Sequence, residues 1–267
     1  MKKYLSNCVS KLALTAATIL LMANMSAAKI VLNPVEYQQG GFALAGFIAY
    51  DDSQSGPRPG VLIIHQWMGI TDYEKMRAEQ LAKTGYVAFV ADIYGKGVRP
   101  KNSDEAGAQA GMYRKDRQLL RDRGEAALAQ LQSSALVDKS KIAAIGYCFG
   151  GGAALELARS GASLAGVVSF HGNLDTPNPA DAQNIKSKIL VLHGGIDPYV
   201  KPEVVSAFEK EMTDASVDWQ LISYGGAVHS FTIPTAGNDI STGSAYNEKA
   251  DKRSWEAMKQ FFGEIFK

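Results

Sequence analysis

The sequence predicts an α/β fold, a mostly parallel, doubly wound sheet with helices on both faces. Three observations lead to this prediction. Short apolar runs lack the period-two alternation of a half-exposed strand, so each is expected to be covered on both sides. Helix-like stretches separate these runs, as the crossovers of a parallel sheet require. One run, KIAAIGY at 141–147, leads directly into the glycine-rich corner CFGGG at 148–152.

The first 28 residues are predicted to be a secretory signal peptide. They carry Lys2, Lys3 and Lys11, then an apolar run from Leu12 to Met22 that is too short for a comfortable membrane span, and they close on small residues up to Ala28. We therefore expect cleavage near Ala28 and export, with the bacterial periplasm as the expected compartment. An uncleaved anchor or a buried N-terminal helix is the alternative interpretation.

Residues 29–267 are long enough for a single α/β domain with one large core. Removing residues 1–28 takes away three of the 28 lysines and arginines and none of the 27 acidic residues, which leaves a net charge of −2. This balance gives no reason to expect binding to nucleic acid or, after cleavage, to a membrane. One cysteine, Cys148, would then remain, so no internal disulfide can form, and an exported protein with one unpaired thiol is unusual.

The elements follow from the pattern in chain order. The segment 30–50 is expected to add antiparallel edge strands in front of the parallel sheet. The helix at 71–85 opens with a capping box, Thr71 and Glu74, and stops at Gly85. The helix at 104–132 is expected to be interrupted near Gly111. Strands are expected at 60–65, 86–92, 141–147, 164–172, 188–195 and 217–223, and the remaining helices at 151–160, 202–212 and 247–266.

Cys148 lies at the centre of a G-x-C-x-G motif between a predicted strand and a predicted helix. This is the pattern of a nucleophile elbow, a sharp turn that lifts one side chain above the sheet of an α/β-hydrolase fold. Glycines are needed because neighbouring backbone passes close by, and the helix N-terminus favours a thiolate. A phosphate-binding turn is the first alternative, but the P-loop lysine and the G-x-G-x-x-G spacing are missing. A buried structural cysteine is the second.

A cysteine thiol needs a neighbouring base to become a strong nucleophile at neutral pH. In α/β-hydrolases the triad residues follow the chain order nucleophile, acid, histidine. Of the four histidines only His229 follows every plausible acid, and Asp197 lies after the preceding strand. Because the ends of parallel strands meet at one rim of the sheet, Cys148, Asp197 and His229 are predicted to converge as a catalytic triad. Taken singly, Asp197 is equally compatible with a turn or capping role and His229 with a solvated loop.

The loop HQWMGIT at 65–71 is expected to complete an oxyanion hole, with the backbone N–H groups of Trp67 and Phe149 as donors. The other histidines, His65, His171 and His193, are interpreted as structural, hydrogen-bonded side chains. Basic residues between 96 and 123 are interpreted as a mostly solvated helix face, of which one or two are free to meet an anionic substrate. The predicted substrate-binding residues are Gln66, Tyr94, Lys96, Tyr199 and Phe231.

The segments GYCFGG, GGIDPYV, VHSFT and IIHQWMG, with the tail YNEKADKRSWEAMKQFF, resemble the dienelactone hydrolase family over nearly the whole chain after residue 28. The resemblance implies an α/β-hydrolase fold with no metal and no organic cofactor. It also implies hydrolysis of a small lactone or carboxylic ester through a thioester, with Cys148 attacking, His229 moving the proton and Asp197 orienting the imidazole.

Three positions depart from the best-known members of that family. Gln66 stands where they have a glutamate that helps to control the ionisation of the cysteine, so that control is expected to be absent. Lys96 and Ile233 stand where they have two arginines that hold a substrate carboxylate. Dienelactone itself is therefore not the expected substrate. A catalytically silent binding or stress-response protein, and a thiol redox protein, are the competing functions; the second lacks a resolving cysteine.

Overall fold

The computed structural model describes residues 29–267, so the predicted signal peptide lies outside the described residues. Its eight strands form one sheet in the order β1-β2-β4-β3-β5-β6-β7-β8. The strands are β1 (Ile30–Gln39), β2 (Phe42–Asp51), β3 (Arg58–Ile64), β4 (Val87–Ala91), β5 (Val137–Tyr147), β6 (Gly166–Phe170), β7 (Lys188–Gly194) and β8 (Trp219–Tyr224). The antiparallel pairs in this sheet are β1–β2 and β2–β4, as expected for 30–50, and the other pairs are parallel.

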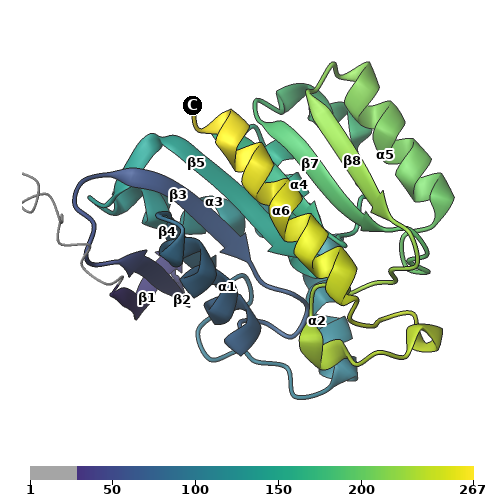
Figure 1. The fold of residues 1–267 in the computed structure, drawn as a ribbon, viewed down its shortest axis with the longest axis horizontal. Coiled ribbons are helices and arrows are strands. Elements are labelled where there is room, and N and C mark those ends of the chain that lie inside the picture. Colours follow the sequence, from purple (N-terminus) through teal and green to yellow (C-terminus); the bar gives the residue numbers. More distant parts are fainter. Residues whose placement is uncertain (1–28) are drawn as a thin grey trace, which may run out of the picture.

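Helices cover both faces of the sheet (Figure 1). They are α1 (Asp72–Lys83), α2 (Ser103–Lys115), α3 (Arg117–Ser133), α4 (Phe149–Arg159), α5 (Pro202–Asp214) and α6 (Glu248–Ile265). Short 3-10 turns lie at Pro179–Asn184, Pro234–Ala236 and Ile240–Thr242. Alternate residues of β3 face opposite sides: Leu62 packs in a core under α3 and α4, while Val61 packs in a core under α1 and α6. This two-sided burial explains the unbroken apolar runs.

Local signals in the sequence explain where two of the helices begin and end. The capping box of α1 is formed by Thr71 and Glu74, as expected. The expected break in the helix at 104–132 is present but lies at Asp116 rather than near Gly111. Asp116 leaves the helical conformation, and its side chain accepts a hydrogen bond from the Leu119 N–H, so it caps α3. Gly111 has open space around it inside α2, where helix propensity alone does not force a break.

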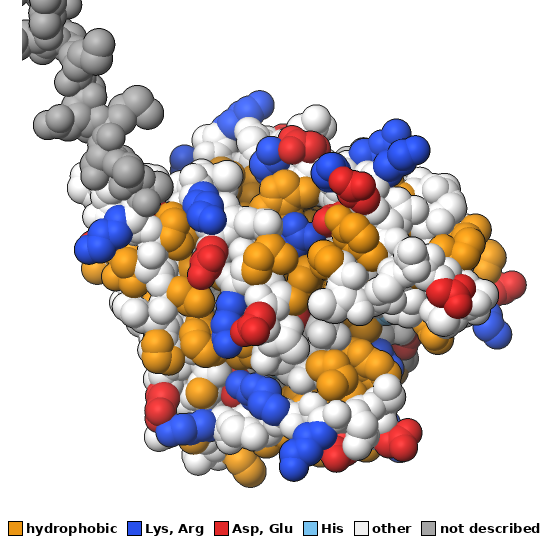
Figure 2. All heavy atoms as spheres, turned by 60° about the horizontal axis from the view of Figure 1, so that its bottom comes forward, with side chains coloured by type: hydrophobic (Ala, Val, Ile, Leu, Met, Phe, Trp, Pro, Cys, Tyr) orange, Lys and Arg blue, Asp and Glu red, His pale blue; other side chains and the backbone are white. Residues whose placement is uncertain are grey.

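The surface carries charges of both signs, without a large area of one sign on the face seen in Figure 2. Hydrophobic side chains on that face form separate groups with lysines, arginines and acidic residues between them. In the described part of the chain no helix combines the length and apolar character needed to cross a membrane.

Candidate active site

Cys148 sits between the last residue of β5 and the first residue of α4, in a strained conformation with φ 55° and ψ −118°. Residues other than glycine rarely adopt a positive φ, and such backbone strain is typical of functional sites. The thiol is almost buried, and it accepts a hydrogen bond from the Phe149 N–H at the start of α4. The sharp corner therefore serves to hold a sulfur over the positive end of a helix.

The glycines on both sides of Cys148 are required by close backbone contacts. A Cβ on Gly146 would lie 1.9 Å from the Gly150 carbonyl oxygen, and a Cβ on Gly150 would lie 2.2 Å from the Ile64 carbonyl oxygen. Both distances are far inside van der Waals contact. The G-x-C-x-G pattern thus reports how tightly α4 is packed against the sheet.

Asp197 and His229 come from the loops after β7 and β8 and meet beside the thiol. The His229 Nδ1 lies 2.7 Å from the Asp197 Oδ2, and the other ring nitrogen is left for the sulfur, with which His229 is hydrogen-bonded. Backbone hydrogen bonds from His229 N to Gly243 O and from Ala245 N to His229 O fix the histidine loop. The three residues that the sequence singled out are in one hydrogen-bonded row.

The negative charge on Cys148 and the positive charge on His229 stabilise each other. Burial opposes ionisation of both groups. Nevertheless, His229 and the Phe149 N–H lower the pKa of the Cys148 thiol below its ordinary value. The thiolate and the hydrogen bond to Asp197 raise the pKa of His229 above its ordinary value. The two shifts have opposite signs on an acid–base pair, so they favour a resting thiolate–imidazolium pair.

The row opens into a cavity of about 340 Å³. Cys148 and His229 line it, together with Trp67 of the loop after β3 and Tyr199 of the loop after β7. Tyr199 is 57 % exposed and packs edge-on against the His229 ring, so it forms the outer wall. Trp67 belongs to the loop that was predicted to supply the second oxyanion donor.

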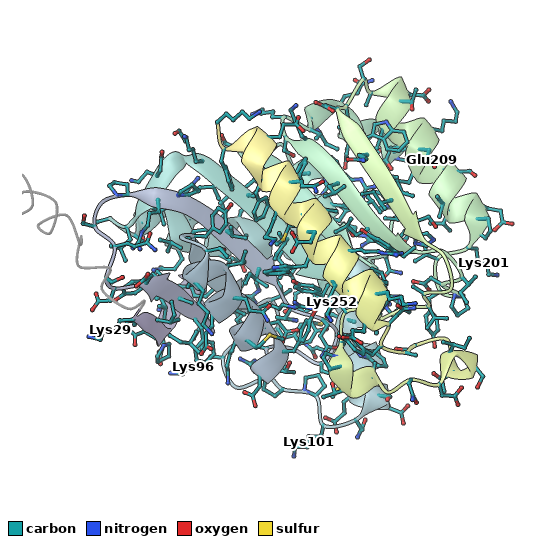
Figure 3. The ribbon with its side chains drawn as sticks, in the orientation of Figure 1. Lys29, Lys96, Lys101, Lys201, Glu209 and Lys252 are labelled. Atoms are coloured by element: carbon teal, nitrogen blue, oxygen red, sulfur yellow. The ribbon has the colours of Figure 1, made fainter. Side chains whose placement is uncertain are left out.

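Four of the five residues expected to bind substrate are not among those that line the cavity. Lys96 forms an ion pair with Glu36 at 2.6 Å and points outward at the edge of the molecule (Figure 3). Phe231 is fully buried against His171. Tyr94 lies behind the loop and donates from its hydroxyl to the Trp67 carbonyl at 2.9 Å. The backbone N–H of Gln66 donates a hydrogen bond to the Glu74 carboxylate.

The cavity also contains residues that the sequence did not single out. Arg114 of α2 projects to it and donates to the Asn173 Oδ1 at 2.7 Å. It was grouped with the solvated basic residues, because nothing in the helical pattern shows that this end of α2 reaches the sheet rim. Ser230 and Ser244 complete the lining. Ser230 directly follows His229, and this position in the sequence was the signal that could have predicted its place in the cavity.

The three other histidines are buried, as expected for structural side chains. His171 is also in direct contact with the site. Its Nδ1 accepts a hydrogen bond from the Cys148 N–H at 3.2 Å, and its Nε2 lies 2.8 Å from the Thr232 Oγ1. Burial, and then the neighbouring His229, hold its pKa well below the ordinary value, so it stays a neutral acceptor. Within residues 29–267, no group of histidine, cysteine and acidic side chains is arranged to hold a metal ion.

A nucleophile elbow after β5, an acid after β7 and a histidine after β8, on a mostly parallel eight-stranded sheet, together define a hydrolase of the α/β-hydrolase class. The family model described as dienelactone hydrolase family matches residues 44–266. The chain therefore belongs to the dienelactone hydrolase family.

Individual relatives agree with this assignment. The crystal structure of P91, a dienelactone hydrolase-like promiscuous phosphotriesterase from metagenomic libraries, is 41 % identical, with a TM-score of 0.85 over 90 % of this chain and 99 % of that one. An uncharacterized protein of Caenorhabditis elegans is 39 % identical over 149 residues, which are 55 % of this chain and 94 % of its own length. A putative carboxymethylenebutenolidase of Saccharolobus solfataricus is 26 % identical over 272 residues, 86 % of this chain and 98 % of its own.

Proposed function

We propose that this hydrolase cleaves a small carboxylic ester or lactone through a Cys148–His229–Asp197 triad and a thioester intermediate. The observation that carries the proposal is the hydrogen-bonded row of these three groups, of which Cys148 and His229 line a cavity. A buried structural cysteine would need neither a strained elbow nor a neighbouring imidazole of raised pKa.

The geometry assigns each group a step. The Cys148 thiolate attacks the carbonyl carbon, and the carbonyl oxygen gains the negative charge and turns toward the Trp67 and Phe149 N–H groups. Collapse of this intermediate breaks the bond to the alcohol oxygen, which takes the proton of the imidazolium at Nε2 of His229. Water, deprotonated by the now neutral His229, then attacks the thioester and releases the acid and the thiolate.

Asp197 keeps the imidazole in the orientation that this exchange needs. Its Oδ2 accepts from Nδ1 of His229, which leaves Nε2 as the atom that faces the sulfur. Its Oδ1 accepts from the Tyr199 N–H at 2.8 Å, so the carboxylate is itself held on both oxygens. An acid held in this way orients the imidazole and stabilises the imidazolium.

The cavity favours compact substrates, and among the described residues that line it Arg114 is the one cation besides the His229 imidazolium. The two family positions that hold a carboxylate do not do so here, because Lys96 is paired with Glu36 and Ile233 is buried. We infer that the carboxylate of dienelactone is not held in the usual way. Any preference for an anionic acyl or alcohol part must come from Arg114.

The test is hydrolysis of p-nitrophenyl acetate by the purified chain. The proposal expects a burst of one p-nitrophenol for each chain, an acetyl group on Cys148 detected by mass spectrometry, and no turnover in Cys148→Ala. A chain that binds such esters but never shows Cys148-dependent turnover would instead be the silent binding protein that the sequence left open.

A second activity is favoured by one comparison. P91, at 41 % identity, is named a promiscuous phosphotriesterase. We propose that the same thiolate attacks phosphotriesters, with the alkoxide or phenoxide leaving and a thiophosphate ester remaining on Cys148. Hydrolysis of a p-nitrophenyl dialkyl phosphate that disappears in Cys148→Ala would support it; release of p-nitrophenol that persists in this variant would contradict it.

We further propose that residues 1–28 direct export to the periplasm and are removed near Ala28. The charge, apolar run and small terminal residues of that segment support this. The mature N-terminus, read from the mass of the protein recovered from a periplasmic fraction, checks the proposal. A chain that retains Met1 in the cytoplasm would contradict it.

A further inference from the structure

The loop that follows β3 has one peptide group whose orientation decides whether the oxyanion hole exists. It joins Gln66 to Trp67, and its N–H is the proposed second donor. In a planar trans peptide the C=O and the N–H point in opposite directions. Whatever holds the Gln66 carbonyl therefore also sets the direction of the Trp67 N–H.

Two donors hold that carbonyl. The His65 Nδ1 lies 2.6 Å from the Gln66 carbonyl oxygen, and the Gly69 N–H donates to the same oxygen at 3.1 Å. The Trp67 N–H has no hydrogen-bond acceptor among residues 29–267. A free N–H on a residue that lines the cavity is what an oxyanion donor requires in the resting protein.

The hydrogen-bond partners of His65 determine its tautomer. The Ile93 N–H donates to Nε2 at 3.2 Å, so Nε2 carries no proton. The single proton of the neutral ring is therefore on Nδ1 and points to the Gln66 carbonyl. Burial lowers the pKa of His65 to about 4, which keeps the ring neutral at physiological pH. The ring is fully buried and packs against Tyr94 and Phe149.

Neighbouring side chains fix the peptide groups on either side. Glu74 accepts from the Gln66 N–H at 3.2 Å, and the Tyr94 hydroxyl donates to the Trp67 carbonyl at 2.9 Å. These contacts hold the ends of the Gln66–Trp67 peptide but do not contact its own oxygen. His65 is the side chain that does.

We infer that His65 is a positioning residue that holds the Gln66 carbonyl through Nδ1–H and thereby aims the Trp67 N–H at the oxyanion of the ester substrate. The inference rests on the proposed hydrolase function. Without the His65 bond, the Gly69 N–H is the one donor left to the Gln66 carbonyl, and the peptide turns more readily. A turned peptide points the negative end of its carbonyl dipole at the site where negative charge develops.

Three variants separate this role from simple packing. In His65→Asn the amide nitrogen takes the place of Nδ1 and still donates to the Gln66 carbonyl. In His65→Gln the amide is at the place of Nε2, where it accepts from Ile93 but does not reach that carbonyl. His65→Leu removes both bonds. We expect kcat for p-nitrophenyl acetate to fall by about 10²- to 10³-fold in the leucine and glutamine variants and to recover in the asparagine variant.

Two further readouts make the result specific to the oxyanion hole. The rate of Cys148 alkylation by iodoacetamide should be unchanged in all three variants, because no oxyanion forms in that reaction. Affinity for a trifluoromethyl ketone, whose adduct carries an oxyanion, should fall in parallel with kcat/KM. Circular dichroism and thermal melting show which variants are folded.

The outcomes are distinguishable. Lack of Cys148-dependent turnover in the wild type refutes the proposed function, and this inference with it. A wild type that turns over, with a glutamine variant as active as the asparagine variant, refutes the inference alone. If the leucine variant does not fold, the comparison of the asparagine and glutamine variants still decides.

Discussion

Removing the imidazole of His229 should raise the pKa of the Cys148 thiol, because His229 is the main group that lowers it. In the wild type the pKa of the thiol is lowered although burial, the largest effect, raises it. His229 supplies the largest opposing contributions, and only the Phe149 N–H and the charge of Arg114 remain in His229→Ala. We therefore expect the thiol of the variant to titrate no lower than an ordinary cysteine, with a pKa of about 8.5.

The size of the effect follows from this limit. A thiol with a pKa of about 8.5 is roughly 3 % ionised at pH 7, so the thiolate population should fall about 30-fold or more from a fully ionised pair. The sign is fixed by the direction of the shift. The wild-type thiolate persists as pH falls from 8.5 and is lost only below the lowered pKa, whereas the variant loses it on passing below the ordinary value.

The assay is the pH profile of iodoacetamide alkylation without substrate, for which Cys148 is the one free thiol among the described residues. Its midpoint reports ionisation and does not depend on how nucleophilicity changes with pKa. Ultraviolet absorbance of the thiolate gives an independent titration. Identical midpoints in the wild type and His229→Ala would refute the ion pair, and with it the choice of His229 as the base.

Three other predictions follow from single contacts. Asp197→Asn should lower kcat for p-nitrophenyl acetate by about 10³- to 10⁴-fold while the melting temperature changes little, because the imidazole loses its orientation; full activity would exclude a role for this acid. Arg114→Met should reduce the kcat/KM ratio of carboxylate-bearing to neutral esters by about 10-fold, the loss of one charged hydrogen bond, whereas Lys96→Met should leave the ratio unchanged. An unchanged ratio in Arg114→Met would mean that Arg114 does not hold the carboxylate. Gly150→Ala should destabilise the fold by about 1–3 kcal/mol or more in chemical denaturation, since the new Cβ would lie 2.2 Å from a β3 carbonyl oxygen; Gly107→Ala, in open space on α2, should be neutral or slightly stabilising, and a Gly150 variant as stable as this control would contradict the close packing.

The fold and the placement of the triad candidates could be predicted because they depend on regularities of the chain. Unbroken apolar runs predict buried parallel strands, and parallel strands place their end loops on one rim. Cys148, Asp197 and His229 each follow a strand, so their convergence needed no knowledge of side-chain contacts. Trp67 was placed in the same way.

The remainder of the site depends on contacts that have no sequence signature. Lys96 is held away from the cavity by Glu36, 60 residues earlier in the chain, on a strand whose position on the sheet edge was expected but whose register was not. Arg114, which lines the cavity, lies in the last turn of α2, a helix that continues past Gly111 to Lys115. Such outcomes depend on helix ends and strand registers, which residue patterns specify only within a few positions.

The crowding around α4 determines where this enzyme is able to change. Gly146 and Gly150 have backbone atoms within 2.2 Å of any added Cβ, so variation at the elbow is closed to every larger residue. The outer wall is different, because Tyr199 is largely exposed and Ser244 is borne on a short loop. Evolution or a protein engineer can therefore exchange residues of the wall without touching the parts that carry out bond breaking. In such a molecule, substitutions change substrate preference more easily than they change the reaction.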